Sequence, residues 1–265
     1  MIWTLLSLLA APLQCDYRDN LFLVKQGENT YQQRVQARFY NFALSCAENL
    51  GGIYDGDDLT VFDGKTKRFD WKNVRNNFDF SQSGASNNLV ALYDGESFHA
   101  YRAEEGRFYS APANPDFRYS RVEAADGVAA LYDGAQMIVF SDRFTARKAR
   151  ERFQHSKLSA GGSIALLYDG DGFIVYDAKD GGFSERSAKN GYLFARVLAS
   201  PIGAMGYDGD QVIAYCPGTK NLIAENVEKD AFSQALYDPV KKEIKLQVNK
   251  TWYQLDSGRC RLIRR

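Results

Sequence analysis

The stretch Ala130-Leu131-Tyr132-Asp133-Gly134 is a short apolar run that ends in Tyr-Asp-Gly, and similar phrases recur along the chain. The other copies are Gly52-Ile53-Tyr54-Asp55-Gly56, Ala91-Leu92-Tyr93-Asp94-Gly95, Leu166-Leu167-Tyr168-Asp169-Gly170, Met205-Gly206-Tyr207-Asp208-Gly209, Ala235-Leu236-Tyr237-Asp238-Pro239 and the degenerate Asp16-Tyr17-Arg18-Asp19. Successive tyrosines are 37, 39, 39, 36, 39 and 30 residues apart. The chain is therefore a tandem repeat.

Each phrase predicts a β-hairpin, because an Asp-Gly pair between two apolar strands suits a two-residue type I′ turn, in which Gly takes positive φ without strain. A strand of alternating or β-branched residues follows the turn, as in Met137-Ile138-Val139-Phe140. A more polar third strand comes next, and then a fourth segment such as Tyr119-Ser120-Arg121. Four short strands with their turns make a unit of about 39 residues.

This unit predicts an all-β fold, a closed β-propeller of four-stranded antiparallel blades. Seven Tyr-Asp phrases favour seven blades, and six blades with a leading hairpin are the alternative. Because the Tyr-Asp-Gly strand is rich in Ala and Gly, we expect it to be the innermost strand, with the aromatic-Ser segment outermost. The unit from Tyr207 is about nine residues shorter than the others, so we expect its outer strand to be reduced or missing.

The repeated Tyr-Asp-Gly units resemble those of β-propeller repeat proteins over nearly all of the chain after residue 14. They carry neither the Gly-His and Trp-Asp pairs of WD40 repeats nor the Ser-x-Asp-x-Gly-x-Thr-Trp box of sialidases. The resemblance implies a fold and transfers no activity.

The first 14 residues differ from the repeats, since Ile2 to Ala11 is an apolar segment too short to span a bilayer. We interpret 1–14 as a signal peptide and 15–265 as a single propeller domain, which predicts a secreted or periplasmic protein. A buried first strand of the ring is the alternative.

Four cysteines in an exported chain predict disulfides. Inner and outer strands of one blade lie roughly 14 Å apart, so Cys15 should not reach Cys46. First and last units are neighbours in a closed ring, and we therefore favour the pair Cys15 and Cys260.

Thirty-three acidic and thirty-three basic residues leave no net charge. Nucleic acid is not an expected partner, no membrane span is expected, and we expect a monomer. The locally basic run 143–150 is interpreted as a solvated outer strand whose charges discourage edge pairing.

Catalytic and metal-binding signals are weak. His99 and His155 fall in different units, with no Cys, Asp or Glu at ligand spacing, and we interpret them as packing residues. The nucleophile elbow, the P-loop and the dinucleotide fingerprint are absent from the sequence, and we expect no cofactor. The repeated Asp residues are interpreted as turn formers, although an acidic ring for a cation such as calcium is the alternative.

These observations favour an exported, non-enzymatic binding or scaffold protein that uses the variable loops of a rigid propeller to bind a protein partner. A carbohydrate-binding or carbohydrate-active propeller, either a lectin or glycosidase-like, is the alternative. The loops opposite the Tyr-Asp-Gly turns vary most in sequence. The predicted binding residues in them are Asn87, Asn88, Asp126, Lys65, Lys67 and Glu105.

Overall fold

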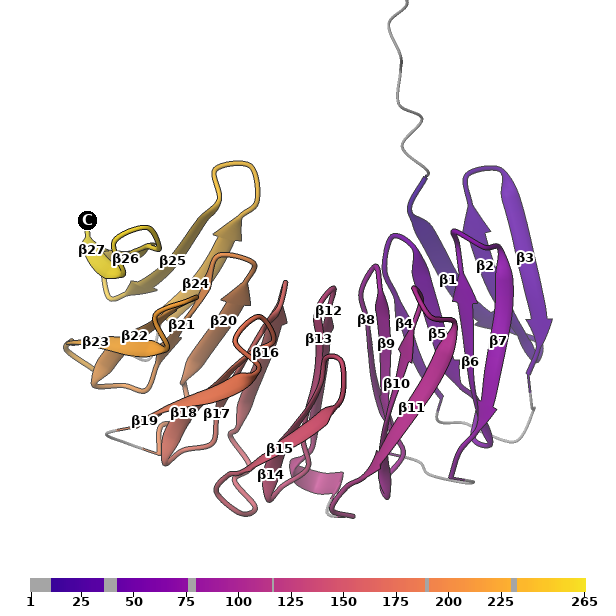
Figure 1. Cartoon of the computed structure of the whole chain (residues 1–265), viewed down its shortest axis with the longest axis horizontal. Coiled ribbons are helices and arrows are strands. Elements are labelled where there is room, and N and C mark those ends of the chain that lie inside the picture. The colour runs from indigo at the N-terminus through magenta and orange to yellow at the C-terminus, as the bar shows by residue number, and fades with distance from the viewer. Residues whose placement is uncertain (1–10, 36–41, 76–79, 116, 189–190, 230–232) are drawn as a thin grey trace, which may run out of the picture.

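The structure, a computed structural model, describes residues 11–35, 42–75, 80–115, 117–188, 191–229 and 233–265. It contains seven antiparallel sheets, one of three strands and six of four (Figure 1). The first four sheets are β1 (Leu13–Arg18), β2 (Leu21–Gln26), β3 (Asn29–Arg34); β4 (Ala43–Cys46), β5 (Leu50–Tyr54), β6 (Asp58–Asp63), β7 (Arg68–Asn73); β8 (Gln82–Ala85), β9 (Leu89–Tyr93), β10 (Ser97–Arg102), β11 (Arg107–Pro112); β12 (Arg121–Ala125), β13 (Val128–Tyr132), β14 (Gln136–Phe140), β15 (Phe144–Lys148). The last three are β16 (Lys157–Gly161), β17 (Ile164–Tyr168), β18 (Gly172–Asp177), β19 (Gly182–Ser187); β20 (Arg196–Ser200), β21 (Gly203–Tyr207), β22 (Gln211–Cys216), β23 (Asn221–Asn226); β24 (Ser233–Asp238), β25 (Glu243–Val248), β26 (Thr251–Asp256), β27 (Arg261–Arg264).

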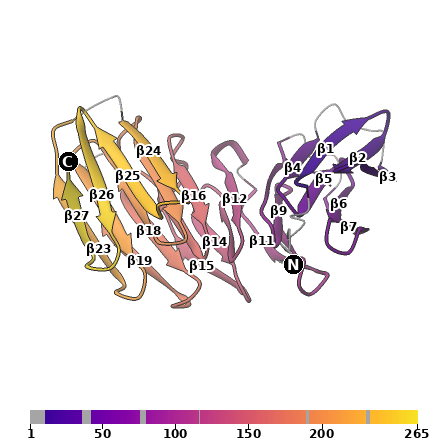
Figure 2. The ribbon, with the colours of Figure 1, turned by 90° about the horizontal axis from the view of Figure 1, so that it is seen from above.

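The chain is an all-β, seven-bladed β-propeller, which confirms the predicted fold class and blade number. Within each sheet the strands pair in chain order. The sheets follow one another along an arc whose two ends are β1–β3 and β24–β27 (Figure 1), and the view from above shows them side by side (Figure 2). The one helix among the described residues, η1 (Phe117–Tyr119), is a single 3-10 turn, and no described helix is long and apolar enough to cross a membrane.

The order of strands within a blade differs from the sequence-based expectation by one position. In every complete sheet except the last, the Tyr-Asp-Gly strand is the second strand, and the segment before it is the first. First strands of neighbouring sheets contact one another, as β8 does with β12 and β12 with β16, so these strands are innermost. The expected outermost segment is therefore the inner edge of the next blade.

The small residues of the Tyr-Asp-Gly strands have a different cause from the one expected. These strands are buried on both faces between adjacent sheets. A Cβ on Gly52 would lie 2.5 Å from Val90 of the neighbouring sheet, and a Cβ on Gly206 would lie 2.5 Å from the Phe173 ring. Close approach of sheet to sheet, rather than convergence on the axis, therefore selects Gly and Ala here.

The motif turns differ from the expected type I′ geometry. Gly134 has a φ of 90°, and the four equivalent glycines also have positive φ, whereas the residue that follows each of them does not. Positive φ at the first central residue alone is typical of type II′ turns. Asp133 closes its turn, because its Oδ1 accepts the N–H groups of Ala135 at 3.0 Å and Gln136 at 2.9 Å. The interpretation of the repeated Asp as a turn former is thus confirmed.

The two terminal sheets explain the irregular spacings. Tyr237 lies on β24, which contacts β20 and is therefore a first strand rather than a second. In the last sheet the Tyr-Asp motif therefore lies on the first strand instead of the second. For this reason Tyr207 and Tyr237 are only 30 residues apart, although β20–β23 form a complete sheet. The expected loss of an outer strand from this unit is wrong. At the other end, β1 contacts β4 and β5 as a second strand would, and the described part of the first sheet has three strands.

The disulfides join Cys15 to Cys46 and Cys216 to Cys260, so the predicted pair Cys15 and Cys260 is wrong. The error follows from the strand order, because Cys46 ends an innermost strand of the second sheet and lies beside β1 of the first. Each bond fastens a terminal sheet to its neighbour. Two disulfides are typical of proteins from oxidising compartments outside the cytosol.

Residues 1–10 lie outside the described residues, so the predicted signal peptide is described only at its end. Leu13 is buried and pairs with Gln26 at the start of β1. The position of a cleavage site therefore stays a prediction.

Candidate functional site

The two ends of the propeller carry different connections. In a four-stranded antiparallel sheet the turns between strands one and two and between strands three and four lie at the same end. We call this end the loop face, and the opposite end, which carries the Tyr-Asp-Gly turns, the turn face. All six predicted binding residues lie on the loop face, in the second, third and fourth sheets.

Four of these residues contact one another across sheet boundaries. The N–H of Asn87 in the third sheet donates to Oδ1 of Asp126 in the fourth at 2.9 Å. The ammonium of Lys65 in the second sheet lies 3.5 Å from Oδ1 of Asn88. The loops of three neighbouring sheets therefore form one continuous polar surface.

The remaining predicted residues, Lys67 and Glu105, are exposed on the same face. Glu105 accepts hydrogen bonds from the Tyr109 hydroxyl and from the Arg102 guanidinium. The hydrogen bond from Tyr109, followed by that from Arg102, holds the pKa of Glu105 below its usual value.

Sequence reasoning missed Arg102, which also links the third and fourth sheets on this face. Its guanidinium bonds Glu105 at 3.1 Å and Asp142 at 3.2 Å, and it lies 5.0 Å from the centre of the Phe140 ring. Arg102 ends β10, and its sequence position alone does not show that Asp142 in the next blade is within reach.

A Ser-His-Asp arrangement lies in the third sheet. Nδ1 of His99 is 2.7 Å from the Ser110 hydroxyl, and its Nε2 is 2.7 Å from Oδ2 of Asp94. The Lys72 ammonium donates to the same Ser110 hydroxyl at 2.6 Å. Burial raises the pKa of Asp94, but the hydrogen bond and charge of His99 outweigh it and lower that pKa to about 2.

The position of His99 in the repeat indicates a structural role for this arrangement. His99 is 4% exposed and takes the place that Ile138, Ile174 and Ile213 fill in other blades. Ser110 and Asp94 satisfy the two ring nitrogens that burial would otherwise leave unpaired. His155, the second histidine, is half-buried and lies edge-on to Phe153.

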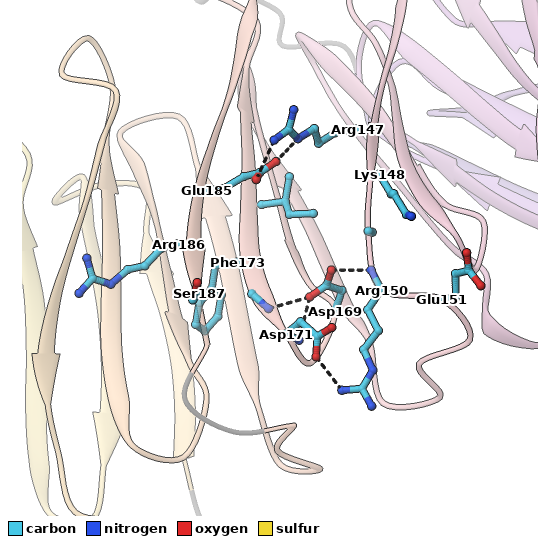
Figure 3. Close-up of a pocket in the computed structure, with 13 residues that line it drawn as sticks. Arg147, Lys148, Arg150, Glu151, Asp169, Asp171, Phe173, Glu185, Arg186 and Ser187 are labelled. Atoms are coloured by element: carbon cyan, nitrogen blue, oxygen red, sulfur yellow. Dashed lines mark hydrogen bonds and ion pairs between the residues drawn. The ribbon is translucent and has the colours of Figure 1, made fainter.

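A groove of about 570 Å³ opens between the fourth and fifth sheets (Figure 3). At one end Arg147 donates to the two carboxylate oxygens of Glu185 through Nε and Nη2, and at the other Arg150 bonds Asp171 at 3.0 Å. Both cations come from the basic run 143–150. Their charges are matched across the groove, so we assign these pairs to blade packing.

The chain matches no protein-family model and no curated protein. Among solved structures it resembles apo AztD from Citrobacter koseri, with 10% identity and a TM-score of 0.47, covering 96% of this chain and 81% of that one. It also resembles Hsv2 from Kluyveromyces lactis, with 7% identity and a TM-score of 0.43, covering 79% of this chain and 70% of that one. Both likenesses concern the fold alone.

Proposed function

We propose that this chain is an exported, non-enzymatic binding module whose loop face binds a protein partner. The observation that supports this proposal is the bonding of Asn87 to Asp126 and of Lys65 to Asn88, which ties loops from three sheets together. A surface fixed in this way loses little conformational entropy on binding, which favours affinity.

The charges on the loop face favour a protein partner over a polyanion. Lys65 and Lys67 share the loop face with the exposed carboxylates of Asp126, Glu105 and Asp142. Acidic groups repel a uniformly negative ligand, whereas a protein surface can present charges of both signs. The exposed Lys67 and Glu105 would then lie at the rim of the contact.

Export is supported by the two disulfides, which persist in oxidising surroundings. We therefore propose that the protein lies in the periplasm or outside the cell, where the partner would also be found.

The test is site-specific photo-cross-linking in extracts of that compartment from the source organism. A photoreactive residue at Lys67 or Asn88 should yield a discrete protein adduct that excess unlabelled chain suppresses. The same residue at Glu96 or Glu151, both exposed on the turn face, serves as the matched control and should yield none.

A glycan array with the same variants examines the carbohydrate alternative. Selective binding to one sugar class that Asn87→Ala and Asn88→Ala abolish would overturn the protein-partner proposal in favour of a lectin. Adducts that form only from Glu96 or Glu151 would place the binding surface at the other end.

A further inference from the structure

Three consecutive innermost strands begin with a basic residue. Arg121 starts β12, Lys157 starts β16 and Arg196 starts β20. Each pairs with the motif tyrosine of its own sheet, so the three stand at one level next to the turn face. The strands succeed one another along the arc (Figure 1), which brings the cations together beside the axis.

The three cations line one cavity of about 200 Å³, together with Ser156, Leu158, Ala195 and Val197. Arg121 donates to the carbonyl oxygens of Ser120 and Gln154, and Arg196 donates to that of Ser233 at 3.1 Å. These bonds orient the guanidinium groups without neutralising them. Within the described ranges, none of the three cations forms an ion pair with a carboxylate.

The surroundings of Lys157 carry the same excess of positive charge. Burial lowers the pKa of its ammonium, and the charges of Arg196 and Arg121 lower that pKa further. The nearest acidic residue along β12 is Glu123, two positions further along the strand, and it does not line the cavity. The cavity is therefore a concentration of like charge, and none of the residues that line it is acidic.

Ser156 adds an independent sign of a ligand. Its side chain is 1% exposed and lines the cavity, yet its hydroxyl has no hydrogen-bond partner among the described residues. A buried hydroxyl without a partner costs free energy, and an anion in the cavity would accept a hydrogen bond from it. The equivalent Ser120 hydroxyl, by contrast, accepts a bond from Gln82 at 2.8 Å.

We propose that this cavity binds one small tetrahedral oxyanion of the phosphate or sulfate class, held by Arg121, Lys157, Arg196 and Ser156. Guanidinium and ammonium groups and a hydroxyl are the donors that such anions take in proteins, and 200 Å³ suits a small anion. The site lies at the turn face, at the opposite end from the proposed partner surface, so it does not depend on the proposed function.

The test is calorimetric titration of the full chain with sodium phosphate, sodium sulfate and O-phosphoserine at constant ionic strength. We expect saturable binding of one anion per chain. If the natural ligand is free phosphate or sulfate, the inorganic ions should bind at least as tightly as O-phosphoserine. If it is a phosphate group carried by a larger molecule, O-phosphoserine should bind more tightly than the inorganic ions.

The repeat itself supplies conservative variants for this test. Gln82 occupies the position of Arg121 and Lys157 in the third sheet, and Ala195 occupies the position of Ser156 in the sixth. Arg121→Gln and Lys157→Gln should each weaken phosphate binding about tenfold or more, and Ser156→Ala should weaken it several-fold. Arg143→Gln, an exposed change on the loop face, should leave it unchanged.

Two results would overturn the proposal. One is the absence of saturable binding of all three probes to the folded wild-type chain. The other is binding that Lys157→Gln leaves unchanged while its circular dichroism and melting temperature match those of the wild type.

Discussion

The backbone N–H of Asn114 donates to Oδ2 of Asp133 in the next sheet at 2.9 Å. The carbonyl oxygen of Asn114 accepts the hydroxyl of Tyr93, in its own sheet, at 2.5 Å. Arg75 and Arg150 are held in the same way, each between the tyrosine of its own blade and the aspartate of the next. The recurring Tyr-Asp pair thus links neighbouring blades by hydrogen bonds, in addition to forming the turn.

Asp133→Ala should destabilise the protein by about 3 kcal/mol, because it leaves the turn N–H groups and the N–H of Asn114 without their charged acceptor. Urea unfolding of both proteins measures the difference. Asp238→Ala is the matched control, since among the described residues Asp238 accepts the turn N–H groups of Val240 and Lys241 and otherwise forms a long ion pair with the exposed Lys241 at 3.9 Å. It should cost less than about 1 kcal/mol. Equal losses for the two variants would show that the contact between sheets contributes nothing.

Gly134→Val should lower the melting temperature clearly, because a β-branched residue is strained at a φ of 90°. The expected cost is about 2 kcal/mol. Gly182→Ala is the control, because Gly182 does not have positive φ and an added Cβ would meet only a carbonyl oxygen at 4.0 Å. A melting temperature of Gly134→Val equal to that of Gly182→Ala would contradict the turn geometry.

The sequence predicted the number of blades because the Tyr-Asp-Gly phrase marks one hairpin in each. It misplaced the strands within a blade because a hairpin signal identifies two paired strands and does not say which edge of the sheet faces the axis. Small residues suggested the axis, but Gly52 and Gly206 are small because a neighbouring sheet approaches them. The exclusion of the pair Cys15 and Cys46 followed from this displacement. The choice of Cys260 followed from the expectation that the first and last sheets are neighbours, whereas they form the two ends of the arc (Figure 1).

The sequence alone predicted the residues of the loop face, but it did not predict the cavity on the turn face. Antiparallel pairing fixes the end at which each turn lies, so Asn87, Asp126 and Lys65 could be placed on one face from sequence alone. The cavity around Lys157 could not be found from the sequence alone, because the residues that line it begin strands that were expected to be outermost in the blades. The aromatic-Ser-basic segments were visible as a repeat, and only the strand order shows that they line the axis.

Replacing Cys15 and Cys46 together with Ser should destabilise the first sheet selectively, since this disulfide fastens β1 to β4. Closure of a 31-residue separation predicts a loss of about 3–4 kcal/mol. Hydrogen exchange followed by mass spectrometry should show faster exchange in β1–β3 and unchanged exchange in β16–β19. Uniform acceleration in all sheets would mean that the terminal blade does not unfold separately.

The contact between His99 and Asp94 predicts a specific loss of stability in acid. The pKa of Asp94 is about 2 in the folded protein, against an ordinary value of 3.8. A carboxyl whose pKa is lowered by folding stabilises the protein above its unfolded pKa, and this contribution is lost as the pH falls from about 4 to about 2. The shift corresponds to about 2 kcal/mol, and both side chains are nearly fully buried, so solvent screening is small.

His99→Ile separates this contribution from that of other carboxylates, because Ile fills the same place in three other blades. The variant removes the hydrogen bond and the charge that hold the pKa of Asp94 down, while burial, which raises it, remains. Chemical unfolding at pH 5, 4, 3 and 2 should therefore give a shallower decline for His99→Ile than for the wild type, by up to about 2 kcal/mol over this range. His155→Leu, which changes the half-buried histidine, should follow the wild-type curve. Parallel curves for wild type and His99→Ile would show that His99 does not hold the pKa of Asp94 down and serves only to fill the core.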